Sequence, residues 1–103
     1  MDNYKVIEEK LKGHEPFRGN TMWAMWDGAG TYLVFSYQTK IAEYNADDDD
    51  GRTLNPRQHS VTTSKHQSII ARAWGFPPLA KLRRLTAYPN TPVVSELRLG
   101  MKK

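Results

Sequence analysis

Two short runs of aromatic and β-branched residues constrain the fold of this chain more than any other feature of its sequence. The runs cover residues 21–26 (T-M-W-A-M-W) and 31–37 (T-Y-L-V-F-S-Y), and the tetrapeptide D-G-A-G lies between them. Aromatic and β-branched side chains favour strands, and glycines tolerate the positive φ angles that hairpin loops often need. The sequence therefore predicts an antiparallel β-hairpin at the centre of the fold.

Both faces of this hairpin carry large apolar side chains. Alternation along the second run places Leu33, Phe35 and Tyr37 on one face, and Tyr32 and Val34 on the other. A sheet with one solvent-exposed face should instead alternate apolar with polar residues. We therefore expect the second face to be covered as well, by helices, by the C-terminal residues or by a second copy of the chain in a homodimer. The alternative is an aromatic surface on which nucleobases stack.

The residues around the hairpin predict an α+β fold. A short N-terminal helix is expected at residues 4–12, capped by Asn3 or Asp2 and ended by Gly13. Further strands are expected at residues 41–44 and 57–61, separated by a long loop. We predict an antiparallel sheet of three to four strands that packs against this helix and one central helix.

The central helix has the clearest local signal in the sequence. Ser64 and Gln67 have the spacing of a capping box, with Thr63 as an alternative cap, and an apolar-periodic run follows. Gly75 and the two prolines after Phe76 should end the helix, which predicts a central helix over residues 64–74.

The C-terminal part of the chain has weaker patterns. Leu79, Leu82 and Leu85 recur at every third residue and indicate a short helix, and residues 93–99 indicate an edge strand or a loose tail. We interpret residues 1–103 as one domain, with a core at residues 1–76 and a basic extension at residues 77–103.

Five consecutive residues at the expected start of the central helix form a candidate binding site. A helix N-terminus attracts anions through its free backbone N–H groups, and hydroxyl and cationic side chains would strengthen that attraction. The candidate anion- or partner-binding residues are Thr62, Thr63, Ser64, Lys65 and His66. The alternative is that the hydroxyl groups only cap the helix.

Charge is divided unevenly along the chain, although the net charge is only +4. Residues 1–51 contain five basic and ten acidic residues, whereas residues 52–103 contain ten basic residues and one acidic residue. Such asymmetry suggests contact with a charged partner, unless the two halves neutralise each other in the fold. Lys81, Arg83 and Arg84 are the candidate phosphate contacts, supported by Lys102 and Lys103.

The sequence gives little support to catalysis or metal binding. It contains no cysteine, which excludes disulfides, thiolate nucleophiles and cysteine-based zinc sites. The four aspartates before Gly51 do not fit a calcium loop, because alanine and arginine would occupy ligand positions. His59 and His66 could approach each other, but no catalytic or metal-binding motif includes them. We expect no catalytic residues, no metal and no cofactor.

The central segment resembles a family of small bacteriophage-encoded proteins of unknown function. The resemblance is carried by Y-L-V-F-S-Y-Q-T-K-I-A at residues 32–42 and H-S-V-T-T-S-K-H-Q at residues 59–67, and it extends over residues 17–75. His59 replaces an aromatic residue that is usual in the family, and Q-T-K replaces a turn with glycine or proline. The resemblance implies a phage origin and expression inside a bacterial cell, but it implies no activity.

Together these observations predict a non-enzymatic accessory protein that binds a host macromolecule, in the first place a host protein, in the cytoplasm of the infected bacterium. The alternative is a nucleic-acid-binding module that uses the basic C-terminal half, and an uncharacterised enzyme comes third. We expect no contact with a membrane, because apolar runs such as the one at residues 32–35 are far shorter than the roughly 20 residues of a membrane-spanning helix.

Overall fold

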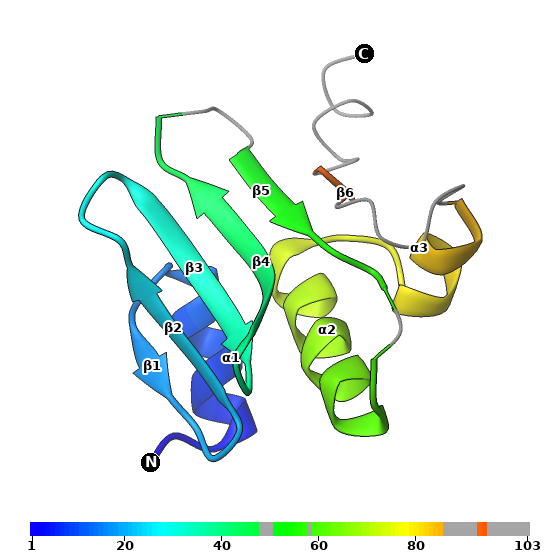
Figure 1. Cartoon of the computed structure of the whole chain (residues 1–103), viewed down its shortest axis with the longest axis horizontal. Helices are drawn as coiled ribbons and strands as arrows, with labels where there is room; N and C mark the ends of the chain where they lie inside the picture. Colours follow the sequence, from blue (N-terminus) through cyan, green and yellow to red (C-terminus); the bar gives the residue numbers. More distant parts are fainter. Residues whose placement is uncertain (48–50, 58, 86–92, 95–103) are drawn as a thin grey trace.

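A single antiparallel sheet forms the framework of the molecule (Figure 1). The computed structural model describes residues 1–47, 51–57, 59–85 and 93–94. Each strand pairs with the next one in sequence, in the order β1 (Phe17–Arg18), β2 (Met22–Trp26), β3 (Thr31–Ser36), β4 (Thr39–Asn45), β5 (Gly51–Leu54) and β6 (Val93–Val94). The predicted α+β class is confirmed. The sheet has more strands than predicted, because β1 and β6 each add two residues at its edges.

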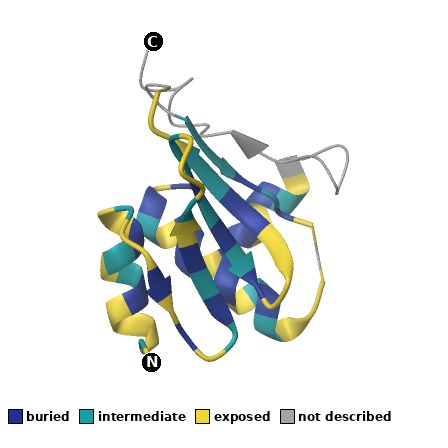
Figure 2. Ribbon diagram, turned by 60° about the vertical axis from the view of Figure 1, so that its left-hand side comes forward, coloured by how far each residue is buried: buried dark blue, intermediate teal, exposed yellow. Residues whose placement is uncertain are grey.

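Three helices accompany the sheet: α1 (Tyr4–Lys12), α2 (Val61–Trp74) and α3 (Leu79–Leu85). The helices α1 and α2 pack against each other and against one face of the sheet, so burial alternates along β2 and β3 (Figure 2). The core between these two layers includes Ile7, Leu11, Met22, Tyr32, Val34, Leu54, Ile70 and Trp74. The described helices are too short or too polar to span a membrane.

The helix α1 matches the prediction in both its bounds and its cap. The Asn3 side chain accepts a hydrogen bond from the Val6 N–H, and the helix ends at Gly13. Its apolar stripe turns Ile7 and Leu11 into the core, because residues four apart lie on the same side of a helix.

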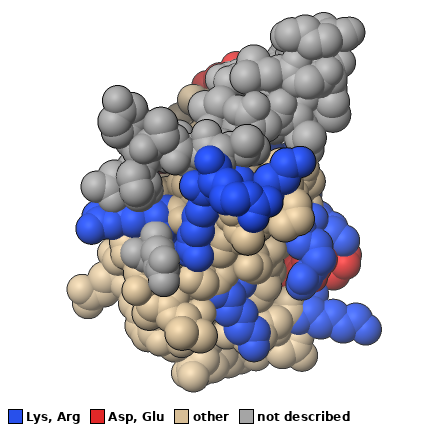
Figure 3. All heavy atoms as spheres, turned by 90° about the vertical axis from the view of Figure 1, so that its right-hand side faces the viewer, with Lys and Arg blue, Asp and Glu red and all other residues tan. Residues whose placement is uncertain are grey.

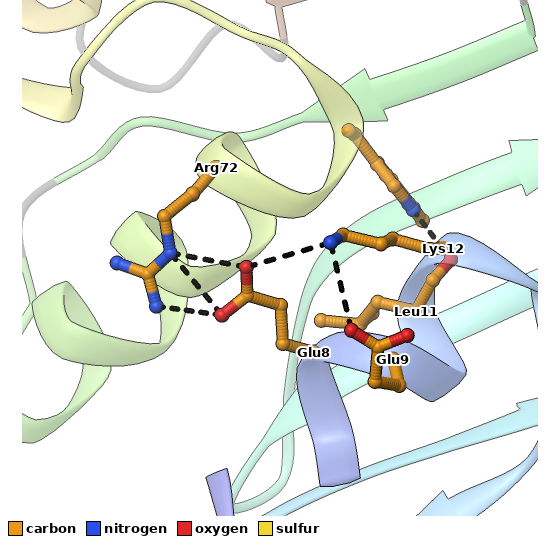
Figure 4. Close-up of polar contacts among 6 residues, drawn as sticks. Glu8, Glu9, Leu11, Lys12 and Arg72 are labelled. Carbon is orange, nitrogen blue, oxygen red and sulfur yellow. Dashed lines mark hydrogen bonds and ion pairs between the residues drawn. The ribbon is translucent and has the colours of Figure 1, made fainter. Parts of the chain in front are cut away.

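Polar contacts at the rim hold α1 against α2 (Figure 4). Glu8 accepts hydrogen bonds from the Arg72 guanidinium, the shortest being 2.8 Å, and the Trp74 indole N–H donates to the Leu11 carbonyl oxygen over 2.9 Å. Lys12 lies 3.6 Å from Glu9. Exposed ion pairs contribute about 0–1 kcal/mol each, so the buried Trp74 contact and the apolar stripe dominate this packing.

The predicted start of the central helix is wrong by three residues. The structure caps α2 with Ser60, whose hydroxyl accepts a hydrogen bond from the Thr63 N–H over 3.1 Å. Neither Ser64 nor Thr63 is the cap, because both already lie within the first turn. The capping box fails because Gln67 is fully buried and donates to the Asn55 and Arg57 carbonyl oxygens instead. The predicted end at Gly75, which has a φ of 79°, is confirmed.

The predicted fourth strand at residues 57–61 is also wrong. The strand that pairs with β4 is β5, which lies within the segment predicted as a loop, and Val61 begins α2 instead. Leu54 anchors β5 because it is fully buried opposite Ala42. The pairing of β3 with β4 shifts in register between Val34 and Phe35. At the same place the alternation of burial along β4 is interrupted, because two consecutive residues, Ile41 and Ala42, are both buried.

The leucine pattern after the two prolines forms α3, as predicted. Leu79 and Leu82 are buried, and α3 packs against α2. Residues 48–50 of the acidic run, residues 95–99 of the predicted edge strand, and Lys102 and Lys103 lie outside the described part of the chain.

Candidate functional site

The face of the sheet opposite α1 and α2 carries a row of apolar side chains on its two central strands. We call Trp23, Met25, Leu33 and Phe35 the apolar strip. Register pairs Trp23 with Phe35 and Met25 with Leu33, and the Trp23 and Phe35 rings stack with centroids 4.1 Å apart. Met25 is 42% exposed, and the other three are partly exposed. The helices α1 and α2 lie on the other face, so among the described residues they do not supply the expected cover of this strip. Cover by the C-terminal residues or by a second copy of the chain stays a prediction.

A surface depression lies at one end of the apolar strip. It has a volume of about 940 Å³, and its lining includes Arg18, Thr21, Trp23, Tyr37 and Thr39. Tyr37 occupies the two-residue turn between β3 and β4 with a φ of 56°, an uncommon conformation for a large side chain, and it is 50% exposed. The Trp23 indole N–H donates to the Tyr37 carbonyl oxygen over 2.9 Å and so holds this turn against the strip.

A buried polar cluster lies on the covered face of the sheet, beneath this end of the strip. His66 Nδ1 lies 2.7 Å from Ser36 Oγ, and His66 Nε2 lies 3.1 Å from Thr21 Oγ1 and 3.4 Å from the Tyr4 hydroxyl. Thr63 Oγ1 lies 2.9 Å from Ser36 Oγ. We call these five residues the histidine cluster. Burial of the ring, and to a lesser extent the nearby Lys65 charge, lowers the pKa of His66, which favours a neutral imidazole.

The short distance between Ser36 and His66 resembles that between a nucleophile and its base. However, His66 has 0% and Ser36 1% of its surface exposed, so no substrate reaches either residue in this structure. The cluster contains no carboxylate that could orient the ring. Its hydrogen bonds join α2, β3 and α1, which is the arrangement of a packing element.

The five residues predicted to bind an anion do not form one site. Thr63 and His66 belong to the histidine cluster, and the Ser64 hydroxyl accepts a hydrogen bond from Arg83 over 3.0 Å. Thr62 is partly exposed. Lys65 is exposed, and its ammonium group lies 4.5 Å from the centre of the Tyr4 ring. The earlier helix start explains this dispersal, because the five side chains point in different directions from the first two turns of α2.

The three predicted phosphate contacts also divide. Arg83 is partly buried; its guanidinium donates to the Pro56 carbonyl oxygen over 2.8 Å and to the Gln67 side chain over 3.0 Å. Lys81 and Arg84 are exposed on α3. Arg83 therefore ties α3 to α2 and to Pro56. Lys81 and Arg84 remain accessible to a ligand.

The sequence did not predict the surroundings of a second histidine, His14. The His14 ring stacks on Tyr44 with centroids 3.7 Å apart, and the Arg52 guanidinium donates to His14 Nε2 over 3.3 Å. Arg52 also lies over the Trp74 ring. Burial and the Arg52 charge lower the pKa of His14 to about 4. No local sequence signal could reveal this cluster, because its members come from four separate segments. Within the described residues, no group of acidic and histidine side chains could hold a metal ion.

Comparison with known proteins gives one finding. Residues 6–75 match the family model DUF8033, which is described as a family of unknown function. Neither the curated proteins nor the solved structures provide a match.

Proposed function

We propose a function for this chain from the premise that it belongs to the DUF8033 family, a family of unknown function. The chain acts as a non-enzymatic binding protein, and its partner is another protein that docks on the apolar strip. The single observation that carries this proposal is the stacked, partly exposed pair Trp23 and Phe35 on the sheet face that the described helices leave open.

The composition of the strip supports a protein partner. Cores of protein–protein interfaces are enriched in aromatic residues and methionine and depleted of charged residues, and most of their binding energy comes from a few such side chains. The strip combines two aromatic residues with Met25 and Leu33. Charged groups lie at its margin, where Lys40 and Glu43 form an ion pair 2.6 Å long.

The partner class follows from the resemblance of residues 17–75 to small bacteriophage-encoded proteins. We therefore propose a protein of the bacterial host as the partner and the cytoplasm of the infected cell as the location. The burial of Ser36 and His66 supports binding rather than catalysis, since the pair closest to a catalytic geometry is occupied by internal hydrogen bonds.

The test is capture of host proteins from a bacterial lysate by three forms of the full chain. We expect the wild-type chain to capture a defined protein and the double variant Trp23→Ala/Phe35→Ala to lose it by 100-fold or more, since hot-spot truncations cost about 2 kcal/mol or more each. The control is Val61→Ser, which removes an apolar side chain that is 89% exposed on α2. Equal capture by all three forms would contradict the proposal.

The mass of the chain in solution shows whether the partner on the apolar strip is a host protein or a second copy of the chain. We expect the same mass for the wild-type chain and the Trp23→Ala/Phe35→Ala variant. A wild-type dimer that this variant converts to a monomer would show that a homodimer covers the strip, and would overturn the assignment of the strip to a host protein.

A further inference from the structure

The outer surface of α2 and α3 differs from the rest of the molecule in its charge. Residues 51–84 contain seven basic residues and no acidic residue. Figure 3 shows lysine and arginine side chains gathered over this face, with acidic side chains only at its margin. Charge of one sign over two adjacent elements creates a field that attracts a ligand of the opposite sign.

Three of the seven basic residues are already engaged within the fold. Arg52 contacts His14 and Trp74, and Arg72 pairs with Glu8 at 2.8 Å. Arg83 donates to Pro56, Ser64 and Gln67. These three contribute to the positive potential, but their donors are directed at internal partners.

The other four, Arg57, Lys65, Lys81 and Arg84, are exposed, and none of them pairs with a carboxylate among the described residues. We call them the basic surface. The contacts of Arg83 with Pro56 and Ser64 bring α3 close to the backbone that carries Arg57 and to the first turn of α2. Lys65 lies on that turn as well, with its ammonium group over the Tyr4 ring, on the side of α2 that faces α1. Lys81 lies three residues before Arg84, which places both on neighbouring positions of α3.

We infer that the basic surface binds the phosphate backbone of a nucleic acid, as a second site independent of the apolar strip. Four exposed cations that have no carboxylate partner among the described residues match a chain of phosphates, and such interfaces are more polar and more positive than those between proteins. Arg83 acts as a positioning residue, because its hydrogen bonds hold α3 against α2 and against Pro56, which precedes Arg57 in the connection between β5 and α2.

An anionic membrane fits this surface less well than a nucleic acid does. Helices that lie on membranes place large apolar side chains beside their basic residues. Over α2 and over α3 up to Arg84, the exposed large apolar side chains are limited to Val61, at the first position of α2. The surface therefore offers charge without the apolar side chains that would enter a bilayer.

The experiment measures binding of the full chain to a labelled 20-base-pair DNA duplex and to a single strand of the same length, at 50 and 200 mM salt. Four phosphate contacts predict a loss of affinity on the order of 100-fold between these salt concentrations. The double variant Lys81→Gln/Arg84→Gln should bind more weakly, and its loss over the same range should fall to about 10-fold. Binding to either form of nucleic acid with this behaviour supports the inference.

The matched control is Lys12→Gln/Lys40→Gln, which removes the same charge at two lysines that already pair with Glu9 and Glu43. It should keep the wild-type salt dependence. An equal loss in both double variants would show that only net charge matters and would overturn the inference. Absence of binding at 50 mM salt, or binding to vesicles containing phosphatidylserine without binding to nucleic acid, would also overturn it.

This outcome is distinguishable from failure of the proposed function. The variant Trp23→Ala/Phe35→Ala should bind nucleic acid like the wild-type chain, and Lys81→Gln/Arg84→Gln should still capture the host protein.

Discussion

The two faces of strand β3 are built from similar side chains but have different neighbours. On the covered face, Tyr32, Val34 and Ser36 have 1% or less of their surface exposed, because α1 and α2 pack over them. On the open face, Leu33 and Phe35 stay partly exposed opposite Met25 and Trp23 of β2, and Phe35 stacks on Trp23. Apolar content alone therefore does not decide which face forms the core. The position of the two helices decides it, and the open face keeps apolar side chains that the core does not need.

The two faces should differ most in how much stability is lost when an aromatic residue of β3 is truncated. We expect Tyr32→Ala to lower the free energy of unfolding by about 3–5 kcal/mol, because it leaves a cavity in the core and removes the hydrogen bond from the Tyr32 hydroxyl to the Glu15 carbonyl oxygen. Phe35→Ala should cost about 1–2 kcal/mol, since it removes a stacked but partly exposed ring. Urea denaturation of both variants measures the difference, and equal losses would mean that the open face is as well covered as the other.

A buried serine of β3 and an exposed serine of α2 should show a smaller difference in stability. Ser36→Ala removes a partner from both His66 and Thr63 in the buried histidine cluster, so we expect a loss of about 1–3 kcal/mol. The matched control is Ser68→Ala, at an exposed position of α2, which should change stability by less than about 0.5 kcal/mol. If the two serine variants unfold at the same urea concentration, the cluster does not stabilise the packing of α2 on β3.

Elements with a local signal were predictable from the sequence. The cap at Asn3, the aromatic hairpin, the helix end at Gly75 and the leucine pattern of α3 all depend on neighbouring residues, and the structure confirms them. The start of α2 was not predictable in this way. Both Ser60 and Ser64 are good caps locally, and the choice between them depends on Gln67, whose partners lie ten and twelve residues away in the chain.

The candidate surfaces were only partly predictable for the same reason. Composition revealed that the second half of the chain is basic, but not that Arg83 is held by Pro56, Ser64 and Gln67. Alternation identified two apolar faces of the hairpin, but it carries no information about which face the helices choose. Strand β5 was missed because a single buried residue, Leu54, anchors it within a polar segment.

Acid should weaken the covered side of the sheet, where the buried His66 and the partly buried His14 lie. The folded protein lowers the pKa of His14 to about 4 and that of His66 below its usual range. Between pH 6.5 and 4 the unfolded chain therefore binds more protons, and stability falls as the pH falls. His14 alone should account for about 1–2 kcal/mol between pH 7 and pH 5.

The variant His14→Asn tests this assignment, because asparagine tolerates the φ of 53° at this position and does not titrate. Its free energy of unfolding, measured at a series of pH values, should change less with pH than that of the wild-type chain. An unchanged pH dependence would show that His14 does not cause the loss of stability at low pH.

The smallest expected effect concerns the turn that borders the open face. Tyr37 adopts a left-handed conformation that glycine adopts without strain, so Tyr37→Gly should raise the stability by up to about 1 kcal/mol. The hydrogen bond from Trp23 remains, since it ends on the backbone oxygen of residue 37. The same variant should bind the host protein more weakly, because a half-exposed aromatic ring beside the apolar strip is lost. A gain in stability together with weaker capture would show that this side chain serves binding at a cost to the fold. Lower stability with unchanged capture would instead place Tyr37 with the covered face, where its ring centre lies 6.4 Å from that of His66.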